Sequence, residues 1–368
     1  MSAEPAEWRP PVRAEFADSE PYGAPQLDVP VALNVNENPF PPPPAVVAEI
    51  ADSVRAAAAR LNRYPDRDAT ALRGALAGYL NGRSAGAGLG ADDVWVANGS
   101  NEVMTHLLQA FGGPGRVMLT FPPTYSMYPE YARATHTRVI EVPRAAPPKF
   151  DLDPDYAAAA VAAAAPDVVM LASPNNPTGT AAPRELIEAL LAAAPGMVIV
   201  DEAYAEFARD GGAGALSLLA DHPNLVVTRT MSKAFALAGA RVGYAAAHPR
   251  VVDALRVVRL PYHVSAVTQA TARAALRHAG ELLADVDVLR AERDRMVEWL
   301  RGRGLQVAES DANFALMGVF DDRRAIWQAL LDRGVLIRET GPDGWLRVSV
   351  GTPAENEIFR TALEEVLG

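Results

Sequence analysis

The chain has 368 residues, 49% of them hydrophobic, which is enough apolar sequence for a globular enzyme of two domains. Its formal net charge of -11 leaves no basic surface for the phosphates of DNA or RNA, so we expect no nucleic-acid partner. The chain has no cysteine, which excludes disulfides, thiolate nucleophiles and thiolate metal sites.

The N-terminal residues and the apolar runs of the sequence indicate the cellular compartment of the protein. Residues 1–15 mix acids, prolines and a tryptophan and lack the apolar segment of a secretory signal, so we expect a cytoplasmic protein. The longest apolar runs, such as residues 157–165, are too short to span a bilayer, and no membrane association is expected. The six histidines include no helical pair at metal-ligand spacing, and we expect no metal.

Residues 1–44 form an arm that is rich in proline. Proline cannot donate a hydrogen bond to a sheet, so the arm cannot supply a core strand. We expect it to belong partly to the smaller domain and to pack across a partner subunit. A helix pattern follows at residues 45–61.

Residues 45–264 are expected to form the larger domain. Four short apolar runs, rich in β-branched residues, lie at 94–97, 168–172, 198–200 and 225–228, and each precedes a polar cluster. Such runs, alternating with helical patterns, are typical of buried parallel strands. We therefore predict an α/β fold, with helices on both faces of a mainly parallel sheet. The loops beyond the carboxyl ends of parallel strands collect at one edge, so the four polar clusters should converge there.

The first cluster is Asn-Gly-Ser-Asn-Glu at residues 98–102, between a strand and a helix pattern. Free backbone N–H groups and the helix dipole make such a helix N-terminus a cradle for an anion such as a cofactor phosphate. The alternative is an ordinary helix cap by Asn98 or Ser100.

The second and third clusters follow the next two strands. Residues 173–179, Ser-Pro-Asn-Asn-Pro-Thr-Gly, form a rigid turn whose asparagine amide could donate to a phenolate oxygen, although a plain loop also explains the pattern. Asp201 ends a strand, with Tyr204 close behind. A carboxylate there is costly to desolvate unless it meets a cation, such as a protonated pyridine nitrogen. The alternative for Asp201 is a cap on the next helix.

The fourth cluster contains one of only two lysines among 34 basic residues; the other, Lys149, lies in a proline turn. Lysine can form an imine with an aldehyde and arginine cannot, so a lysine retained among arginines indicates chemistry. Lys233 follows Thr230 and Ser232 and precedes Arg241 by eight residues. Hydroxyls and a guanidinium around one lysine suit a phosphate beside an aldehyde.

Residues 265–368 are expected to form a smaller α+β domain. A long amphipathic stretch at 269–303 is followed by a strand-like run at 313–317, another helix pattern, and strands at 335–338 and 346–350.

Together the four clusters resemble those of fold type I pyridoxal 5'-phosphate aminotransferases. Four further motifs are similar to those of the histidinol-phosphate aminotransferases within that group, and the resemblance covers nearly the whole chain. These motifs lie at residues 22–28, 36–39, 62–66 and 259–263.

The resemblance implies how pyridoxal phosphate is bound. Lys233 would hold it as an imine, Asp201 would pair with its pyridine nitrogen, and Tyr204 and Asn176 would approach its 3-hydroxyl group. Tyr125 would stack on the ring, with Tyr128 as the alternative. Tyr64 would reach the phosphate from the second subunit of a homodimer, and the same chain would contact it through Ser100, Asn101, Thr230, Ser232 and Arg241.

The resemblance also implies the substrates, L-histidinol phosphate and 2-oxoglutarate with glutamate as a product. Arg347, together with a second arginine, Arg338, would bind their carboxylate or phosphate groups. Tyr22, Tyr262 and Asn36 would shape the substrate pocket. Two rival activities share these motifs: an aromatic aminotransferase and a lyase similar to threonine-phosphate decarboxylase. A non-catalytic regulator would need a DNA-binding domain ahead of the core, which the acidic, proline-rich arm cannot supply.

Overall fold

The larger domain is built around a twisted sheet in the computed structural model, which describes residues 8, 10–17, 19–21, 23–84, 87–212 and 214–368. Within this described part the sheet has seven strands in the order β2-β8-β7-β6-β5-β3-β4. All of them run in one direction except β8, which pairs antiparallel with both β2 and β7. The strands are β2 (Val94–Ala97), β3 (Val117–Thr120), β4 (Arg138–Glu141), β5 (Val168–Ala172), β6 (Met197–Asp201), β7 (Leu225–Thr230) and β8 (Gly243–Ala247).

Helices cover both faces of this sheet, which confirms the expected three-layer α/β/α architecture. The alternation of side chains along β5 shows it: Val169 and Leu171 join one hydrophobic cluster, and Val168 and Met170 join the other. The first cluster is covered by α2 (Thr70–Arg83), α5 (Pro154–Ala164), α6 (Arg184–Ala193) and α8 (Ala266–Arg277), and the second by α3 (Ser100–Phe111), α4 (Met127–Ala134) and α7 (Pro249–Val258).

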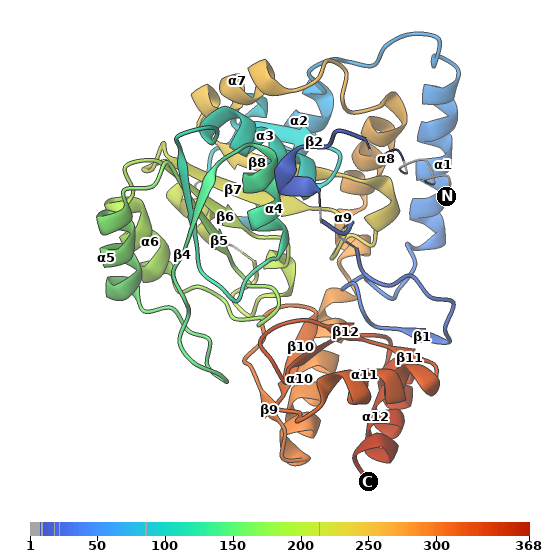
Figure 1. Ribbon diagram of the computed structural model, residues 1–368. Helices are drawn as coiled ribbons and strands as arrows, with labels where there is room; N and C mark the ends of the chain where they lie inside the picture. The colour runs from blue at the N-terminus through green and yellow to red at the C-terminus, as the bar shows by residue number, and fades with distance from the viewer. Residues whose placement is uncertain (1–7, 9, 18, 22, 85–86, 213) are drawn as a thin grey trace, which may run out of the picture.

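The smaller domain lies below the larger one in Figure 1 and has its own core. Its antiparallel sheet has the order β12-β13-β10-β9. The strands are β9 (Gln306–Val307), β10 (Phe314–Gly318), β12 (Arg338–Glu339) and β13 (Leu346–Ser349), and the helices are α10 (Val286–Gly302), α11 (Arg323–Asp332) and α12 (Pro353–Leu367).

The proline-rich arm joins the smaller domain through one short strand. This strand, β1 (Val31–Ala32), pairs in parallel with β11 (Val335–Leu336), and Val31 and Leu33 enter the core of the smaller domain. The arm then leads into α1 (Pro44–Ala58), close to the helix expected at residues 45–61.

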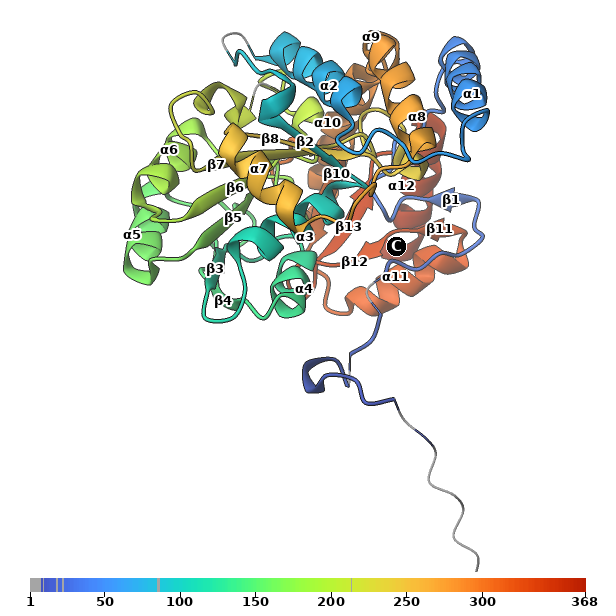
Figure 2. The same ribbon diagram turned by 90° about the horizontal axis from the view of Figure 1, so that it is seen from above.

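The helices after residue 265 divide between the two domains. The long amphipathic stretch at residues 269–303 is divided among α8, α9 (Ala279–Leu282) and α10. Helix α8 packs against α1 and α2, side by side with α1 in both views (Figures 1 and 2), and its Ala272 and Ala275 belong to the core of the large sheet. The domain boundary at residue 265 stays a prediction. The packing of α8 on the larger domain favours a boundary beyond α9.

None of the helices in the described ranges is both long enough and apolar enough to cross a membrane.

Candidate active site

A cavity of about 850 Å³ lies where the carboxyl ends of the large-sheet strands face the smaller domain and the arm. All four polar clusters reach it, as expected for loops at one edge of a parallel sheet. The expected site residues that line it are Asn36, Ser100, Asn101, Tyr125, Asn176, Asp201, Tyr204, Thr230, Ser232, Lys233, Arg241, Arg338 and Arg347.

The N-terminus of α3 faces this cavity without a side-chain cap. Its N-cap residue is Gly99 rather than Asn98 or Ser100, so the capping alternative is wrong. The side chain of Glu102 instead accepts hydrogen bonds from the backbone N–H and the amide of Asn98, at 2.6 and 2.8 Å. The first N–H groups of α3 are therefore available to an anion.

Arg241 closes the other side of this cradle. Gly99 has φ +90°, a backbone conformation that favours glycine, and a Cβ atom on it would lie 2.3 Å from Nη2 of Arg241 and would displace that guanidinium. Arg241 Nη1 donates to Ser232 Oγ at 3.2 Å, and Thr230 Oγ1 donates to the same oxygen at 3.0 Å. A guanidinium, two hydroxyls and a bare helix N-terminus fit a phosphate dianion.

Asp201 ends β6 as a buried carboxylate. Burial raises its pKa to about 6, although hydrogen bonds from Tyr128 Oη at 2.9 Å and Thr228 Oγ1 at 3.3 Å oppose the shift. The following short helix, residues 205–207, has Tyr204 as its N-cap, so the alternative of Asp201 as a helix cap is wrong. A buried carboxylate of this kind fits a cationic ring nitrogen.

The two tyrosines proposed for ring stacking have different positions. Tyr128 is fully buried and its hydroxyl is bonded to Asp201. Tyr125 lines the cavity, with its ring 5.7 Å from that of Tyr128 and perpendicular to it. This arrangement favours Tyr125 as the stacking residue and gives Tyr128 a role that the sequence did not indicate.

Lys233 lines the cavity, and its amine donates to the carbonyl oxygen of Val35 at 2.8 Å. Burial, then the positive charge of Arg347, lowers the pKa of Lys233 to about 8. Lys149, by contrast, is exposed. A fraction of the Lys233 amine is therefore uncharged near neutral pH, which both imine formation and proton transfer require.

The hydroxyl of Tyr204 and the amide of Asn176 approach the cavity from two different loops. Tyr204 Oη accepts a hydrogen bond from Asn36 Nδ2 at 3.0 Å. Asn176 Oδ1 accepts one from Arg347 Nη1, which orients the amide nitrogen of Asn176 as a donor. Asn36 is itself fixed by Ser349, through its backbone N–H and its side-chain oxygen, both at 2.9 Å.

The two expected substrate arginines are held by backbone carbonyls. Arg347 is buried and donates through Nη2 to Asn34 O at 2.8 Å. Arg338 donates through Nη2 to Gly23 O at 3.1 Å, which ties the smaller domain to the arm segment lining the cavity mouth. Tyr22, the neighbouring position in that arm, lies outside the described residues.

Tyr64 and Tyr262 do not line the cavity of their own chain. Their rings stack on each other with centroids 4.3 Å apart, and Tyr64 is 79% exposed. The two side chains therefore form one unit on the surface.

Sequence reasoning missed three features of the site: the Tyr128 hydroxyl behind Asp201, and the Asn34 carbonyl and Glu37 carboxylate of two residues that line the cavity. Glu37 lies within a motif that carried the resemblance, but nothing in the pattern indicated its position beside Lys233. The backbone carbonyl of Asn34 has no residue-type signal at all, because every residue carries that group.

The fold and this cavity define the class of the protein. The chain belongs to the class I and II aminotransferase family, whose family model matches residues 29–363.

The chain is also similar to individual members of known families, both in sequence and in structure. The chain is 60% identical to the histidinol-phosphate aminotransferase of Thermobifida fusca, over 97% of this chain and 96% of the relative. Among solved structures it is similar to the histidinol-phosphate aminotransferase of Sinorhizobium meliloti in complex with pyridoxal 5'-phosphate, with a TM-score of 0.81 and 28% identity over 92% of this chain and 91% of that one. It is also similar to the aspartate aminotransferase of Thermus thermophilus with maleate, with a TM-score of 0.77 and 26% identity over 91% and 90%.

Proposed function

We propose that this chain is a pyridoxal-phosphate enzyme that transfers the amino group of L-histidinol phosphate to 2-oxoglutarate, a step of histidine biosynthesis. The observation that carries the proposal is the convergence of Lys233, the carboxylate of Asp201 and the bare N-terminus of α3 on one cavity. The similarity to histidinol-phosphate aminotransferases over nearly the whole chain supports the choice of substrate.

The cofactor would be held at both ends by groups of the large domain. Asp201 would pair with its ring nitrogen, and α3, Thr230, Ser232 and Arg241 would hold its phosphate. When bound, pyridoxal phosphate supplies an electron-withdrawing ring that stabilises negative charge on the substrate α-carbon.

Proton transfer falls to Lys233. Its Nζ atom accepts the proton that leaves the α-carbon of the amino substrate and, in the second half-reaction, returns one to the α-carbon derived from the keto acid. A pKa near 8 keeps the amine close to the working pH, where a general base is most effective. Tyr204 and Asn176 would donate hydrogen bonds to the cofactor oxygen next to this centre.

One pair of arginines would serve both substrates. Arg347 is fixed by Asn34 and Asn176, and Arg338 is attached to the arm through one carbonyl. The planar guanidinium suits either carboxylate or phosphate in a bidentate contact. A fixed arginine beside a more loosely held one can accept anions of two sizes.

Histidinol phosphate, phenylalanine and threonine phosphate, each supplied with 2-oxoglutarate, test the proposal. We expect glutamate formation from histidinol phosphate with a kcat/KM at least about 100-fold above that for phenylalanine, because the phosphate-binding groups would remain unpaired with phenylalanine. Similar values for the two would favour the aromatic aminotransferase. Release of carbon dioxide from threonine phosphate without consumption of keto acid would identify the lyase.

A homodimer with shared sites is part of the proposal. Both stacked tyrosines are exposed, and three further exposed apolar residues, Leu61, Val257 and Leu260, lie within five positions of one of them in the chain. Exposed apolar side chains of this kind are typical of a subunit interface. Because Tyr64 and Tyr262 stack on each other, both would enter the partner's cavity together.

Hybrid dimers test the shared site. Lys233→Ala should be inactive and Tyr64→Ala should lose cofactor readily, yet a hybrid of the two would contain one intact site. Random assembly should therefore restore about one quarter of the wild-type sites. Absence of any restored activity would mean that Tyr64 serves its own chain. We also propose a cytoplasmic location, because both substrates are charged metabolites that do not cross membranes unaided.

A further inference from the structure

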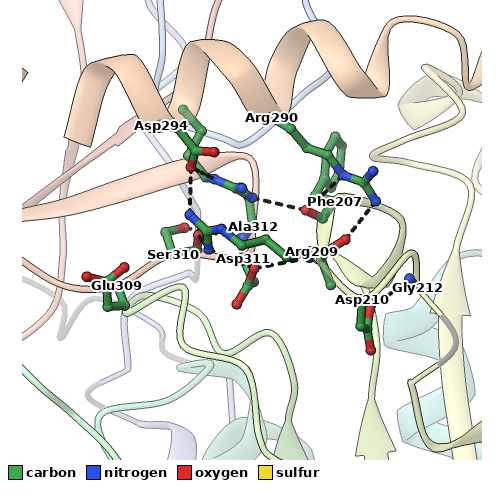
Figure 3. A network of polar contacts seen from close by, with 12 residues as sticks. Phe207, Arg209, Asp210, Gly212, Arg290, Asp294, Glu309, Ser310, Asp311 and Ala312 are labelled. Atoms are coloured by element: carbon green, nitrogen blue, oxygen red, sulfur yellow. Dashed lines mark hydrogen bonds and ion pairs between the residues drawn. The ribbon is translucent and has the colours of Figure 1, made fainter. Parts of the chain in front are cut away.

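Residues 205–212, which directly follow Tyr204, are attached to the smaller domain by polar contacts around helix α10 (Figure 3). Arg290 of α10 donates to the carbonyl oxygens of Glu206, Phe207 and Ala208, at 2.7, 3.2 and 2.7 Å. One guanidinium thus binds three consecutive carbonyls of a turn that belongs to the larger domain.

Arg293, one turn further along α10, is completely buried at the same place. It donates through Nη1 to Phe207 O at 3.0 Å and to Ala312 O at 3.3 Å. It therefore joins the turn after Tyr204 to the loop that precedes β10 in the smaller domain.

Arg209 makes the connection in the opposite direction, from the larger domain to the smaller (Figure 3). Its guanidinium donates to Asp294 at 2.6 Å, and to the carboxylate of Asp311 and the carbonyl of Ser310, both at 2.8 Å. We call these three arginines, Arg209, Arg290 and Arg293, the arginine junction.

The arginine junction borders a buried hydrophobic cluster that reaches the cavity. Tyr204, Phe207, Leu289 and Phe314 belong to this cluster. The ring of Tyr204 meets that of Phe314 edge to face at 5.1 Å, and the guanidinium of Arg347 lies 5.1 Å above the same Phe314 ring. One phenylalanine therefore contacts both a residue expected at the cofactor and a residue expected at the substrate.

The loop of residues 310–312 also touches the turn that carries Asn176. Asp311 donates its backbone N–H to Gly179 O at 2.8 Å. Gly179 has φ +84°, and a Cβ atom there would lie 2.9 Å from Ser310 Cα, so the two backbones approach too closely for a side chain at residue 179. Both loops that present Tyr204 and Asn176 are thus anchored to one loop of the smaller domain.

The chemistry of the contacts explains why arginines are used. The carbonyls of Glu206 and Phe207 have no backbone donor within this short turn, whereas that of Ala208 also accepts from the N–H of Gly211. A guanidinium offers five N–H groups in a rigid plane, so it fixes the orientation of the turn as well as its distance from α10. Apolar packing alone would fix the distance less specifically.

We propose that Arg290 and Arg293 are positioning residues of the transamination reaction, which hold the Tyr204 hydroxyl and, through Phe314, the Arg347 guanidinium in register with Lys233. This inference rests on the proposed function. Neither arginine lines the cavity, so their effect is transmitted through the turn and through Phe314.

Arg290→Met tests the proposal, because methionine retains an apolar stem and removes all donors. Its matched control is Arg301→Met on the same helix, where Arg301 donates to Val307 O and to Glu309 within the smaller domain. Each is prepared as apoprotein and as holoenzyme, and Arg290→Lys is included to ask whether a single positive donor restores part of the function.

Two measurements separate positioning from general stability. In the apoprotein, the amide hydrogen-exchange rate of residues 205–212 should rise about 10-fold in Arg290→Met, because the variant loses the net stabilisation of roughly one hydrogen bond. The same rate should stay unchanged in Arg301→Met. In the holoenzyme, the pH midpoint of the visible band of the bound cofactor should shift in Arg290→Met alone, with kcat reduced about 10-fold and KM for 2-oxoglutarate raised. Arg290→Lys should recover part of each effect.

Two results would overturn the inference. One is an unchanged spectroscopic midpoint and kcat in Arg290→Met despite faster exchange at residues 205–212. The other is an equal change in Arg301→Met. If Arg290→Met does not fold, the same measurements on Arg293→Lys and Arg290→Lys decide. If the wild-type protein fails to turn over histidinol phosphate but reacts with glutamate, the substrate proposal fails, and the exchange and spectroscopic measurements still test the junction.

Discussion

The two ends of the cavity are built in different ways. The expected cofactor end comes from the carboxyl ends of strands of one sheet: Asp201 ends β6, Thr230 ends β7, Lys233 lies just beyond β7, and α3 follows β2. The expected substrate end is assembled from the arm, the turn with Asn176 and the smaller domain.

The cofactor end of the cavity is therefore preorganised, whereas the substrate end can adjust. Asp201 accepts two side-chain hydrogen bonds inside the core, and Ser232 is bonded to both Thr230 and Arg241. Among the described residues of the arm, Arg338, in contrast, has one hydrogen bond, to Gly23 O. A cofactor that stays bound suits the first kind of end, and substrates of two sizes suit the second.

The largest expected effect is at the cofactor end. Lys233→Ala should lower the rate by more than about 10⁴-fold, because it removes both the anchor and the general base, and it should abolish the visible band of the protein-bound cofactor. Absorption spectra and single-turnover kinetics measure this. Lys149→Ala, which removes the exposed second lysine, is the control, and loss of the band in that variant would contradict the assignment.

Next in size is a change at the substrate end. Arg347→Lys should reduce kcat/KM by about 100-fold for both histidinol phosphate and 2-oxoglutarate, because lysine cannot keep the bidentate contact or the bonds to Asn34 and Asn176. Steady-state kinetics of the two half-reactions measure it. Arg324→Lys, at an exposed ion pair with Glu339, should change neither. A loss confined to one substrate would show that the two anions do not share this arginine.

The smallest expected effect concerns pH at the preorganised end. Tyr128→Phe removes a donor that lowers the pKa of Asp201, so that pKa should rise from about 6 by roughly one unit. Since only the charged carboxylate attracts a cationic ring nitrogen, apoprotein affinity for the cofactor falls as the pH drops through the pKa of Asp201.

The fall in affinity should therefore begin about one pH unit higher in Tyr128→Phe. Titration of apoprotein with pyridoxal phosphate from pH 5 to 8 measures it. Tyr244→Phe, which alters a buried tyrosine facing the charges of Glu206 and Arg229, is the control. Coincident profiles for wild type and Tyr128→Phe would rule out this role for Tyr128.

The raised pKa of Asp201 also predicts how the stability of the apoprotein depends on pH. The pKa of Asp201 is raised on folding, so its contribution to stability is fully present below the unfolded pKa and is lost as the pH rises through about 6. Thermal denaturation of the apoprotein should show this loss extending to higher pH in Tyr128→Phe.

Much of the preorganised end could be predicted from the sequence because its signals are local. The strands β2 and β5 have the bounds that their apolar runs predicted, and the clusters behind them reach one cavity. Local pattern also predicted the small α+β domain. It did not show that α8 would pack on the larger domain, because an amphipathic helix shows that it has a partner but not which one.

The sequence by itself determined the fold class and the family, and it singled out Lys233 as the candidate reactive residue, because strand periodicity and a rare residue type are properties of short segments. Only the tertiary structure showed three contacts: Tyr128 donates a hydrogen bond to Asp201, Arg347 donates to the carbonyl of Asn34, and Arg290 donates to carbonyls of the turn after Tyr204. These contacts join residues far apart in the chain, and several use backbone carbonyls. Since every residue has a carbonyl, its partner is fixed by the packing of the two domains and has no signature in the sequence.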